Sequence, residues 1–274
     1  MAREILVLQP NGKTGRRVVS RLMAHDVSVR GASRASTPPF DWGEPDTWPA
    51  TVAGADAAFV VYHPDIAYPG AADRIVSFVD LARRNGVDRL VLLSGRGEHE
   101  AEKCEKILRE SGADWTIVRS AWFTQNFSEG FLVDAVRGGV VALPAGDVAE
   151  PFVDVDDIAD VVVAALTDDR HIGRLYEVTG PRLLTFADTV REIGEATGRE
   201  ITYVPVTRDR YRTDAVARGV PPARVDLLIG LFTETLDGRN AQLADGVPEA
   251  LGRSPRDFGD VVRATAPTGV WEPV

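Results

Sequence analysis

The sequence predicts an α/β fold, a doubly wound parallel sheet with a smaller, partly helical C-terminal lobe. Three observations carry this prediction. Short apolar blocks rich in Val, Ile and Leu alternate with amphipathic stretches through the first half of the chain. A glycine-marked turn, "NGKTG", follows the first apolar block and leads into an amphipathic stretch. After about residue 120 the alternation loosens, and helix-like patterns dominate to the end.

Each of the first five apolar blocks has the pattern of a strand that helices bury on both faces. Turn residues flank every block, and repeated strand–helix–strand units imply right-handed parallel crossovers. The expected strands are Glu4–Leu8, Val27–Ala32, Ala57–Tyr62, Arg89–Ser94 and Asp114–Arg119.

Amphipathic patterns predict the helices between and after these strands. In "DRIVSFVDLARRNG" apolar residues recur at helical spacing until Gly86. A polar helix is expected over Glu100–Glu110, stopped by Gly112. The stretch "PFVDVDDIADVVVAAL" predicts a strand and then a helix with an Asp N-cap. The stretch "RLYEVTGPRLLTFADTVREIGEATG" repeats this plan with Thr185 as the N-cap, and a strand over Ile201–Val206 follows.

These patterns divide the chain into a larger first domain and a smaller lobe. We expect the first domain over residues 1–150, with a strand and helix near 151–180 packing back onto it, and the lobe over 181–274. Ligands of such sheets bind at the carboxyl ends of the strands, so we expect the lobe to cover that edge.

Composition and charge exclude several classes of protein. The 274 residues include 31 Lys and Arg and 41 Asp and Glu, a net charge of −10, and an acidic surface repels nucleic acid. No apolar run approaches the roughly 20 residues that a membrane helix needs. The first strand begins by Glu4, which leaves no room for a signal peptide. We therefore expect a soluble cytoplasmic protein with a small-molecule substrate.

No metal site is predicted. The four histidines lie far apart, without the spacing of metal ligands. The acidic residues of "DVDDIAD" suit the end of a strand and the N-terminus of a helix, where carboxylates are stabilised by the helix dipole. The single cysteine, Cys104, excludes an intramolecular disulfide.

The glycine-marked turn has the pattern of a phosphate-binding site. Backbone N–H groups at a helix N-terminus bind anions, and glycines allow a diphosphate to approach closely. Against this, Gln9 stands where a first glycine is expected, and Pro10 removes one N–H donor. Two glycines alone also fit an ordinary tight turn. The expected cofactor-binding residues are Asn11, Gly12, Lys13, Thr14 and Gly15.

The residue after the second expected strand discriminates between two cofactors. An acid about 20 residues after the glycines would bind the ribose 2′-hydroxyl of NAD. Here "GASRAS" places Ser33 and Arg34 at that point, and an arginine pairs with a 2′-phosphate. With the strand before the turn and the helix after it, Arg34 favours nucleotide binding, with NADP(H) preferred over NAD(H).

The chain resembles the NmrA-like branch of the short-chain dehydrogenase/reductase superfamily. Phrases that carry the resemblance include "GKTG", "ASR", "LVLLSG", "ESGADWTIVR", "WFTQNFSEG" and "PFVDVDDIADV". It looks most similar to the ergot-alkaloid festuclavine/agroclavine dehydrogenase type. The resemblance implies a Rossmann domain that binds NADP(H), a substrate cleft under a small C-terminal lobe, and self-association as a homodimer. The family also contains regulators that bind nucleotide without turnover.

The resemblance also raises a question about catalysis. Many short-chain reductases use a Ser, matched here by Ser94, and a Tyr-x-x-x-Lys motif after it. No tyrosine occurs between Tyr68 and Tyr176, and Lys103 lies two residues out of register. This absence argues against carbonyl reduction through a tyrosine acid. We expect hydride transfer to a C=N (iminium) bond, or to an activated C=C or C=O bond, without the Tyr–Lys pair.

Several residues remain candidates with two interpretations each. Ser94 could contact substrate or cofactor, or cap a turn; His99 could supply a proton, or be a solvated helix residue. Tyr62, near the end of a strand, is a further cofactor candidate. Alternative functions are a redox-sensing regulator and, motivated by Gln9 and Pro10, a non-redox isomerase or cyclase. The substrate-cleft candidates, for which core packing is the alternative, are Trp122, Phe123, Asn126 and Phe152.

Overall fold

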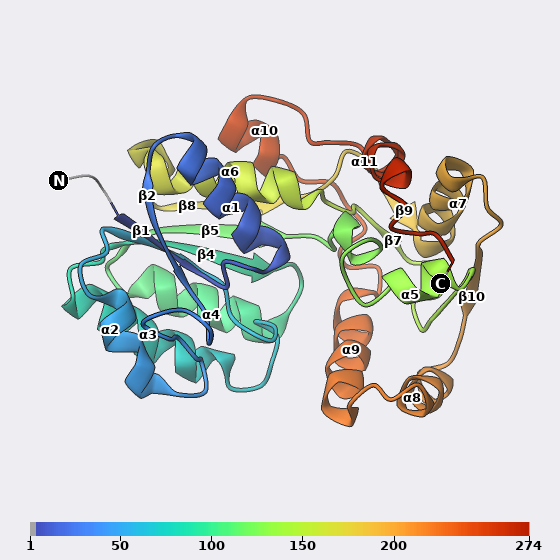
Figure 1. Ribbon diagram of the computed structural model, residues 1–274, viewed down its shortest axis with the longest axis horizontal. Coiled ribbons are helices and arrows are strands. Elements are labelled where there is room, and N and C mark those ends of the chain that lie inside the picture. The colour runs from blue at the N-terminus through green and yellow to red at the C-terminus, as the bar shows by residue number, and fades with distance from the viewer. Residues whose placement is uncertain (1–3, 274) are drawn as a thin grey trace. The chain divides into compact units, whose positions relative to one another are not determined.

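The computed structural model describes residues 4–273, which form two compact units. The first unit runs to Ser120 and adds Val155–Val178 and Asp245–Arg253. The second unit contains Ala121–Asp154, Thr179–Ala244 and the chain from Ser254 onward (Figure 1).

This division differs from the boundaries expected from the sequence, which were at residues 150 and 181. Residues 121–154 belong to the second unit, and residues 245–253 return to the first. The returning segment contains helix α10 (Gly246–Leu251), which packs against strand β8 (Arg174–Val178) and helix α6 (Val155–Thr167). A short helix that joins a distant part of the chain leaves no periodic signal in the sequence around it.

The first unit is built on a six-stranded parallel sheet in the order β2-β1-β3-β4-β5-β8. The predicted α/β fold is confirmed, and the five expected strands are present within two residues of their predicted ends. Strand β1 has β2 on one side and β3 on the other, so the strand order reverses there, as at a ligand-binding switch point. The remaining strands are β1 (Glu4–Leu8), β2 (Ser28–Ala32), β3 (Ala57–Val60), β4 (Arg89–Gly95) and β5 (Asp114–Ser120).

Helices cover both faces of this sheet (Figure 1). On one face α1 (Lys13–Ala24) packs against α6, and on the other α3 (Ala71–Arg84) packs against α4 (His99–Glu110). The short helices α2 (Trp48–Val52), η1 (Pro45–Thr47) and η3 (Asp169–His171) complete the unit. This arrangement buries the strands on both sides, which explains their continuous apolar runs.

Aromatic side chains form the core below the loop that follows β2. Phe40, Trp42, Trp48 and Phe78 are buried, and their ring centroids lie 5.1 to 6.0 Å apart. The indole of Trp42 donates to the carbonyl of Val61 at 3.0 Å, and that of Trp48 donates to the carbonyl of Asp41 at 2.7 Å. Because both buried N–H groups are satisfied, the loop from β2 to α2 has a defined conformation.

The second unit combines two small sheets with helices around an aromatic core. Phe127, Phe152, Phe186 and Phe258 pack together in that core. The parallel pair is β6 (Val140–Leu143) with β10 (Thr202–Pro205), and the antiparallel pair is β7 (Ala149–Glu150) with β9 (Leu184–Thr185). The helices are η2 (Thr124–Asn126), α5 (Val133–Arg137), α7 (Phe186–Thr197), α8 (Arg208–Ala217), α9 (Pro222–Thr235), α11 (Phe258–Thr265) and η4 (Ala266–Thr268).

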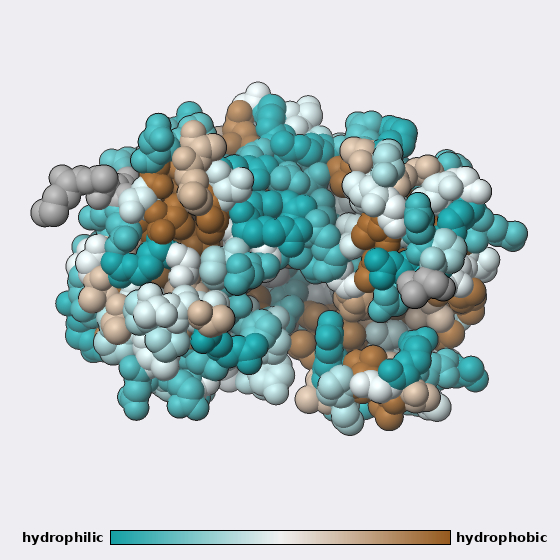
Figure 2. Space-filling model, viewed as in Figure 1, coloured by the Kyte–Doolittle hydropathy of each residue, from teal (hydrophilic) through white to brown (hydrophobic). Residues whose placement is uncertain are grey.

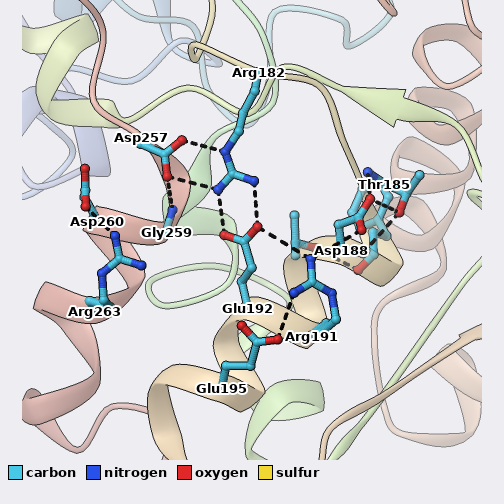
Figure 3. Close-up of polar contacts among 12 residues, drawn as sticks. Arg182, Thr185, Asp188, Arg191, Glu192, Glu195, Asp257, Gly259, Asp260 and Arg263 are labelled. Atoms are coloured by element: carbon cyan, nitrogen blue, oxygen red, sulfur yellow. Dashed lines mark hydrogen bonds and ion pairs between the residues drawn. The ribbon is translucent and has the colours of Figure 1, made fainter.

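Arg182 connects two helices of the second unit (Figure 3). Its guanidinium donates to both carboxylate oxygens of Glu192 on α7, at 2.6 and 2.7 Å, and to both of Asp257, at 2.6 and 3.0 Å. Asp257 is also the N-cap of α11 and accepts from the N–H of Gly259 at 2.8 Å. Arg182 therefore links α7 to the N-terminus of α11 through two bidentate contacts. Its hydrogen bonds to Asp257 lower the pKa of that carboxyl group.

The visible surface is predominantly hydrophilic, and apolar side chains are confined to separate patches (Figure 2). Within residues 4–273, the helices are all too short or too polar to cross a membrane.

Replacing Arg182 should weaken the second unit. We expect Arg182→Gln to lower the free energy of unfolding by about 1–2 kcal/mol, because bidentate ion pairs are lost but the arginine is 38% exposed. Urea denaturation followed by circular dichroism measures this. Arg210→Gln, which removes an ion pair of a 68% exposed arginine with Asp214 on α8, is the control and should change stability by less than about 0.5 kcal/mol. Equal effects of the two variants would contradict the role given to Arg182.

The first unit should lose stability in acid because of His171. This residue is buried, accepts from Arg170 at one ring nitrogen and hydrogen-bonds Tyr176 at the other, an arrangement that suits the neutral ring. Burial and then the charge of Arg170 lower the pKa of His171 below the ordinary 6.5. The unfolded chain therefore binds a proton that the folded chain excludes. The resulting stability is fully present above pH 6.5 and is lost as the pH falls below it.

Urea titrations between pH 5 and 8 test this expectation. The unfolding free energy of the wild type should fall more steeply below pH 6.5 than that of His171→Gln. His25→Gln, at an exposed histidine, should retain the wild-type slope. If the His171 variant keeps the full slope, another group is responsible.

Candidate functional site

The turn between β1 and α1 begins with a residue other than glycine in a backbone conformation that favours glycine. Gln9 adopts φ of +55°, in the left-handed region that favours glycine. Its N–H donates to the carbonyl of Ala32 at 3.0 Å, and its own carbonyl accepts from the N–H of Gly12 at 3.0 Å. Tertiary contacts thus hold Gln9 in a conformation that costs about 1–2 kcal/mol for a non-glycine residue.

Close packing limits the side chains that fit around this turn, most severely at residue 15. A Cβ on Gly15 would lie far inside the van der Waals radius of the Gln9 carbonyl oxygen, so α1 can start this close to β1 only with glycine there. A Cβ on Gly31 in β2 would lie 3.0 Å from the Pro10 ring. Pro10 therefore packs against the neighbouring strand. A Cβ on Gly12 would lie 3.3 Å from the Gln9 carbonyl, a much milder contact.

The N-terminus of α1 suits an anion. Gly12 is its N-cap, no side-chain hydrogen bond caps the helix, and the first turn has no acidic residue. Lys13 and Arg16 stand in that first turn, and Arg17 pairs with Asp156 at 3.0 Å. The helix dipole and the basic residues both favour a phosphate group at this end.

A pocket of about 720 Å³ opens at the carboxyl ends of β1, β2 and β3. This is the sheet edge where α/β proteins bind nucleotides. The predicted residues Arg34 and Tyr62 both line it, together with Gln9. The other lining residues are Phe40, Asp41, Trp42, Gly43, His63, Pro64, Tyr68, Pro69, Gly70, Asp73, Arg74 and Ser77.

Two arginines of the pocket form no ion pair among the described residues. Within residues 4–273, Arg34 and Arg74 make no ion pair and no side-chain hydrogen bond. Arg34 is exposed, and Arg74 on α3 is half-buried. Tyr62 packs against Trp42 with a centroid distance of 4.9 Å, and burial raises the pKa of its hydroxyl, which therefore stays protonated at neutral pH. The site fits the adenosine end of a dinucleotide, with aromatic surface, cations and a hydroxyl donor.

Ser94 lies in a buried polar network at the carboxyl ends of β4, β5 and β8. Its side chain is 2% exposed and donates to Glu105 of α4 at 2.6 Å. Arg119 binds both carboxylate oxygens of Glu105 and reaches Glu177 at 3.3 Å. Glu177 also accepts from Arg96 at 2.6 Å. The hydroxyl proton of Ser94 is thus held by an ion-paired carboxylate, while its oxygen lone pairs remain acceptors.

The other predicted residues near Ser94 are placed differently. His99 begins α4 with its side chain 81% exposed and 3.8 Å from Glu102. Lys103 is exposed and pairs with Glu100 at 2.8 Å. Cys104 is buried, and burial raises the pKa of its thiol to about 12, which makes it an inert core residue.

Sequence reasoning missed the partners of Ser94. Arg119 and Glu177 stand near the ends of otherwise apolar strands, and Glu105 is a buried acid in a polar helix. Charges at strand ends in "TIVRS" and "LYEV" were a usable signal, because a charge there needs a partner. Which charge pairs with which depends on strand order, and the order is not visible in the sequence.

The predicted cleft residues all belong to the second unit. Trp122 stacks on Phe232 at 5.4 Å and donates to Thr235 at 3.0 Å. Phe123 and Asn126 are half-buried, in or beside η2. Phe152 is 2% exposed in the aromatic core, which favours the packing interpretation for that residue. Over residues 4–273, no three His, Cys, Asp or Glu side chains are arranged to hold a metal ion.

The chain is similar to several known oxidoreductases. The NAD(P)H azoreductase of Xenophilus azovorans is 29% identical over 89% of this chain and 86% of that protein. Festuclavine synthase II of Penicillium roqueforti is 30% identical over 94% of this chain and 96% of that protein. A crystal structure of the NADPH-dependent quinone oxidoreductase of Escherichia coli with NADPH has a TM-score of 0.80 at 18% identity, over 95% of this chain and 99% of that chain, and so shares the fold.

The family follows from a match that includes α1, Ser94 and all the residues that line the pocket except Gln9. Residues 11–169, more than half of the chain, match the NAD(P)H-binding family. This chain therefore belongs to the NAD(P)H-binding family.

Proposed function

We propose that the protein is an NADP(H)-dependent reductase that transfers hydride to a C=N (iminium) bond, or to an activated C=C or C=O bond, of a small metabolite. Two observations support this reaction class: the Ser94 hydroxyl donates its hydrogen bond to Glu105, and the chain lacks the Tyr–Lys pair. A reduction whose hydride step needs no protein proton donor is consistent with this arrangement, and addition to an iminium carbon is such a step.

The first unit supplies the groups that would hold the cofactor. The α1 N-terminus, with Gly12, Lys13, Thr14 and Gly15, would bind the diphosphate. Arg34 would pair with the 2′-phosphate, which is the reason to prefer NADP(H) over NAD(H). When bound, a reduced nicotinamide supplies a hydride ion. Catalysis by the protein then depends mainly on positioning and on exclusion of water.

We assign Ser94, near the carboxyl end of β4, as a hydrogen-bond acceptor for the ligand. Because the Ser94 hydroxyl donates its hydrogen bond to Glu105, and Arg119 holds Glu105, Ser94 can orient an N–H group, such as a carboxamide, through its lone pairs. It would therefore position a ligand without delivering a proton to it.

The names of the relatives support the substrate class. The azoreductase, at 29% identity, acts by its name on an azo bond, and the quinone oxidoreductase, which shares the fold, acts by its name on quinones. Both names favour an electron-poor double bond as the hydride acceptor. Contributions of Trp122, Phe123 and Asn126 to the substrate site, and a homodimer, remain predictions. A nucleotide-binding regulator would bind NADPH but reduce nothing.

Arg34 tests the cofactor assignment. We expect Arg34→Ala to weaken NADPH binding about ten- to hundredfold, the loss of one charged contact, and to leave NADH binding within about twofold. Calorimetry on the purified protein measures both. Arg84→Ala, at the exposed end of α3, should bind like the wild type. Wild-type protein that binds neither cofactor at millimolar concentration would overturn the proposed function.

Ser94 tests the reaction class, with NADPH consumption measured over a panel of imines, enones and quinones. For the best substrate, we expect Ser94→Ala to lower kcat less than about tenfold, whereas loss of a proton donor costs about 10²–10⁴-fold. Ser120→Ala, a buried hydroxyl that donates to the Ser94 carbonyl, controls for packing. A 100-fold loss confined to Ser94→Ala would make Ser94 the proton donor. Binding without reduction across the panel would favour the regulator.

A further inference from the structure

His63 stands beside Arg34 in the proposed cofactor pocket. It follows β3 by three residues and lines the pocket with Arg34 and Asp41. Within residues 4–273, the His63 ring and the Arg34 guanidinium make no hydrogen bond and no ion pair. An imidazole and a guanidinium therefore share a solvent-accessible pocket, and neither is neutralised by a bonded carboxylate.

Partial burial and the neighbouring charge of Arg34 favour the neutral form of the His63 ring. Partial desolvation first, and then the charge of Arg34, lower the pKa of His63 below 6.5, and Asp41 acts in the opposite direction. The other titratable or charged groups that line this pocket are Tyr62, Tyr68, Asp73 and Arg74. An added dianion near Arg34 would reverse the balance, because it would cancel the repulsion and stabilise the imidazolium.

We propose that His63 is a second contact of the 2′-phosphate, and that the protein takes up a proton at His63 when it binds NADP(H) but not when it binds NAD(H). This inference rests on the proposed NADP(H) function. The proton comes from the solvent and is returned when the cofactor leaves. His63 thereby becomes a cofactor-specificity residue that acts together with Arg34.

The direction of the pH effect follows from linkage. Binding raises the proton affinity of His63, so NADP(H) affinity increases as the pH falls, by up to about tenfold per pH unit between the free and bound pKa values. The second ionisation of a phosphate ester near pH 6 opposes the effect at lower pH. The useful window is therefore about pH 6–8. NAD(H) carries a neutral hydroxyl at this point, so its affinity does not depend on the protonation of His63 in this way.

Proton uptake can be measured directly by calorimetry of NADP⁺ and NAD⁺ binding at pH 7 in two buffers with different ionisation enthalpies. We expect net proton uptake on NADP⁺ binding and none on NAD⁺ binding. In His63→Asn the uptake should disappear, and NADP⁺ affinity should fall about three- to tenfold. His25→Asn, at an exposed histidine after α1, should behave as the wild type.

Proton NMR gives an independent readout, because the chain has four histidines and the His63 signal is the one that His63→Asn removes. Its titration midpoint should rise on addition of NADP⁺ and stay unchanged with NAD⁺. Uptake that persists in His63→Asn, or a midpoint that does not rise with bound NADP⁺, would overturn this inference while leaving the proposed function intact. Failure of the wild type to bind either dinucleotide would overturn both.

Discussion

The close approach of the Gln9 carbonyl to Gly15 is the constraint on which the rest of the first unit depends. No side chain fits at residue 15, and so α1 can begin directly above the end of β1. That position lets Arg17 and Arg21 of α1 reach Asp156 and Asp160 of α6, which fixes the two helices on one face of the sheet. Gln9, whose carbonyl sets this approach, also lines the pocket at the same sheet edge.

Charged side chains at this sheet edge are paired near Ser94 but lack ion pairs in the pocket, within residues 4–273. Around Ser94, two arginines and two glutamates form a paired and largely buried network, which holds side chains in one arrangement. In the pocket, Arg34 and Arg74 lack ion pairs within residues 4–273, and remain available to an anion. The paired network around Ser94 fixes the positions of its side chains, which suits the orientation of a ligand. The arginines of the pocket can bind an anion, because no carboxylate among the described residues already neutralises them.

Local sequence patterns predicted the features of the first unit that depend on short stretches of chain, such as its strands. The five strands appear near their predicted ends because buried apolar runs between turns have few alternatives. Arg34 could be placed in the pocket from the sequence because only α1 and β2 lie between it and the turn after β1. The return of residues 245–253 to the first unit was not predictable, since its cause is contact with β8 and α6. Nor was the pairing of Ser94 with Glu105, which depends on how α4 packs beside the strand that carries Ser94.

The sequence by itself determined the alternation of strands and helices, the glycine turn, the arginine after β2 and the missing tyrosine. Each of these is a local property, set by residue type and short spacing. Only the tertiary structure decided that Gln9 adopts a glycine-like conformation, that Ser94 donates a hydrogen bond to Glu105, and that His63 shares a pocket with Arg34. These three depend on contacts between segments far apart in the chain, and such contacts exist only after the sheet order is established.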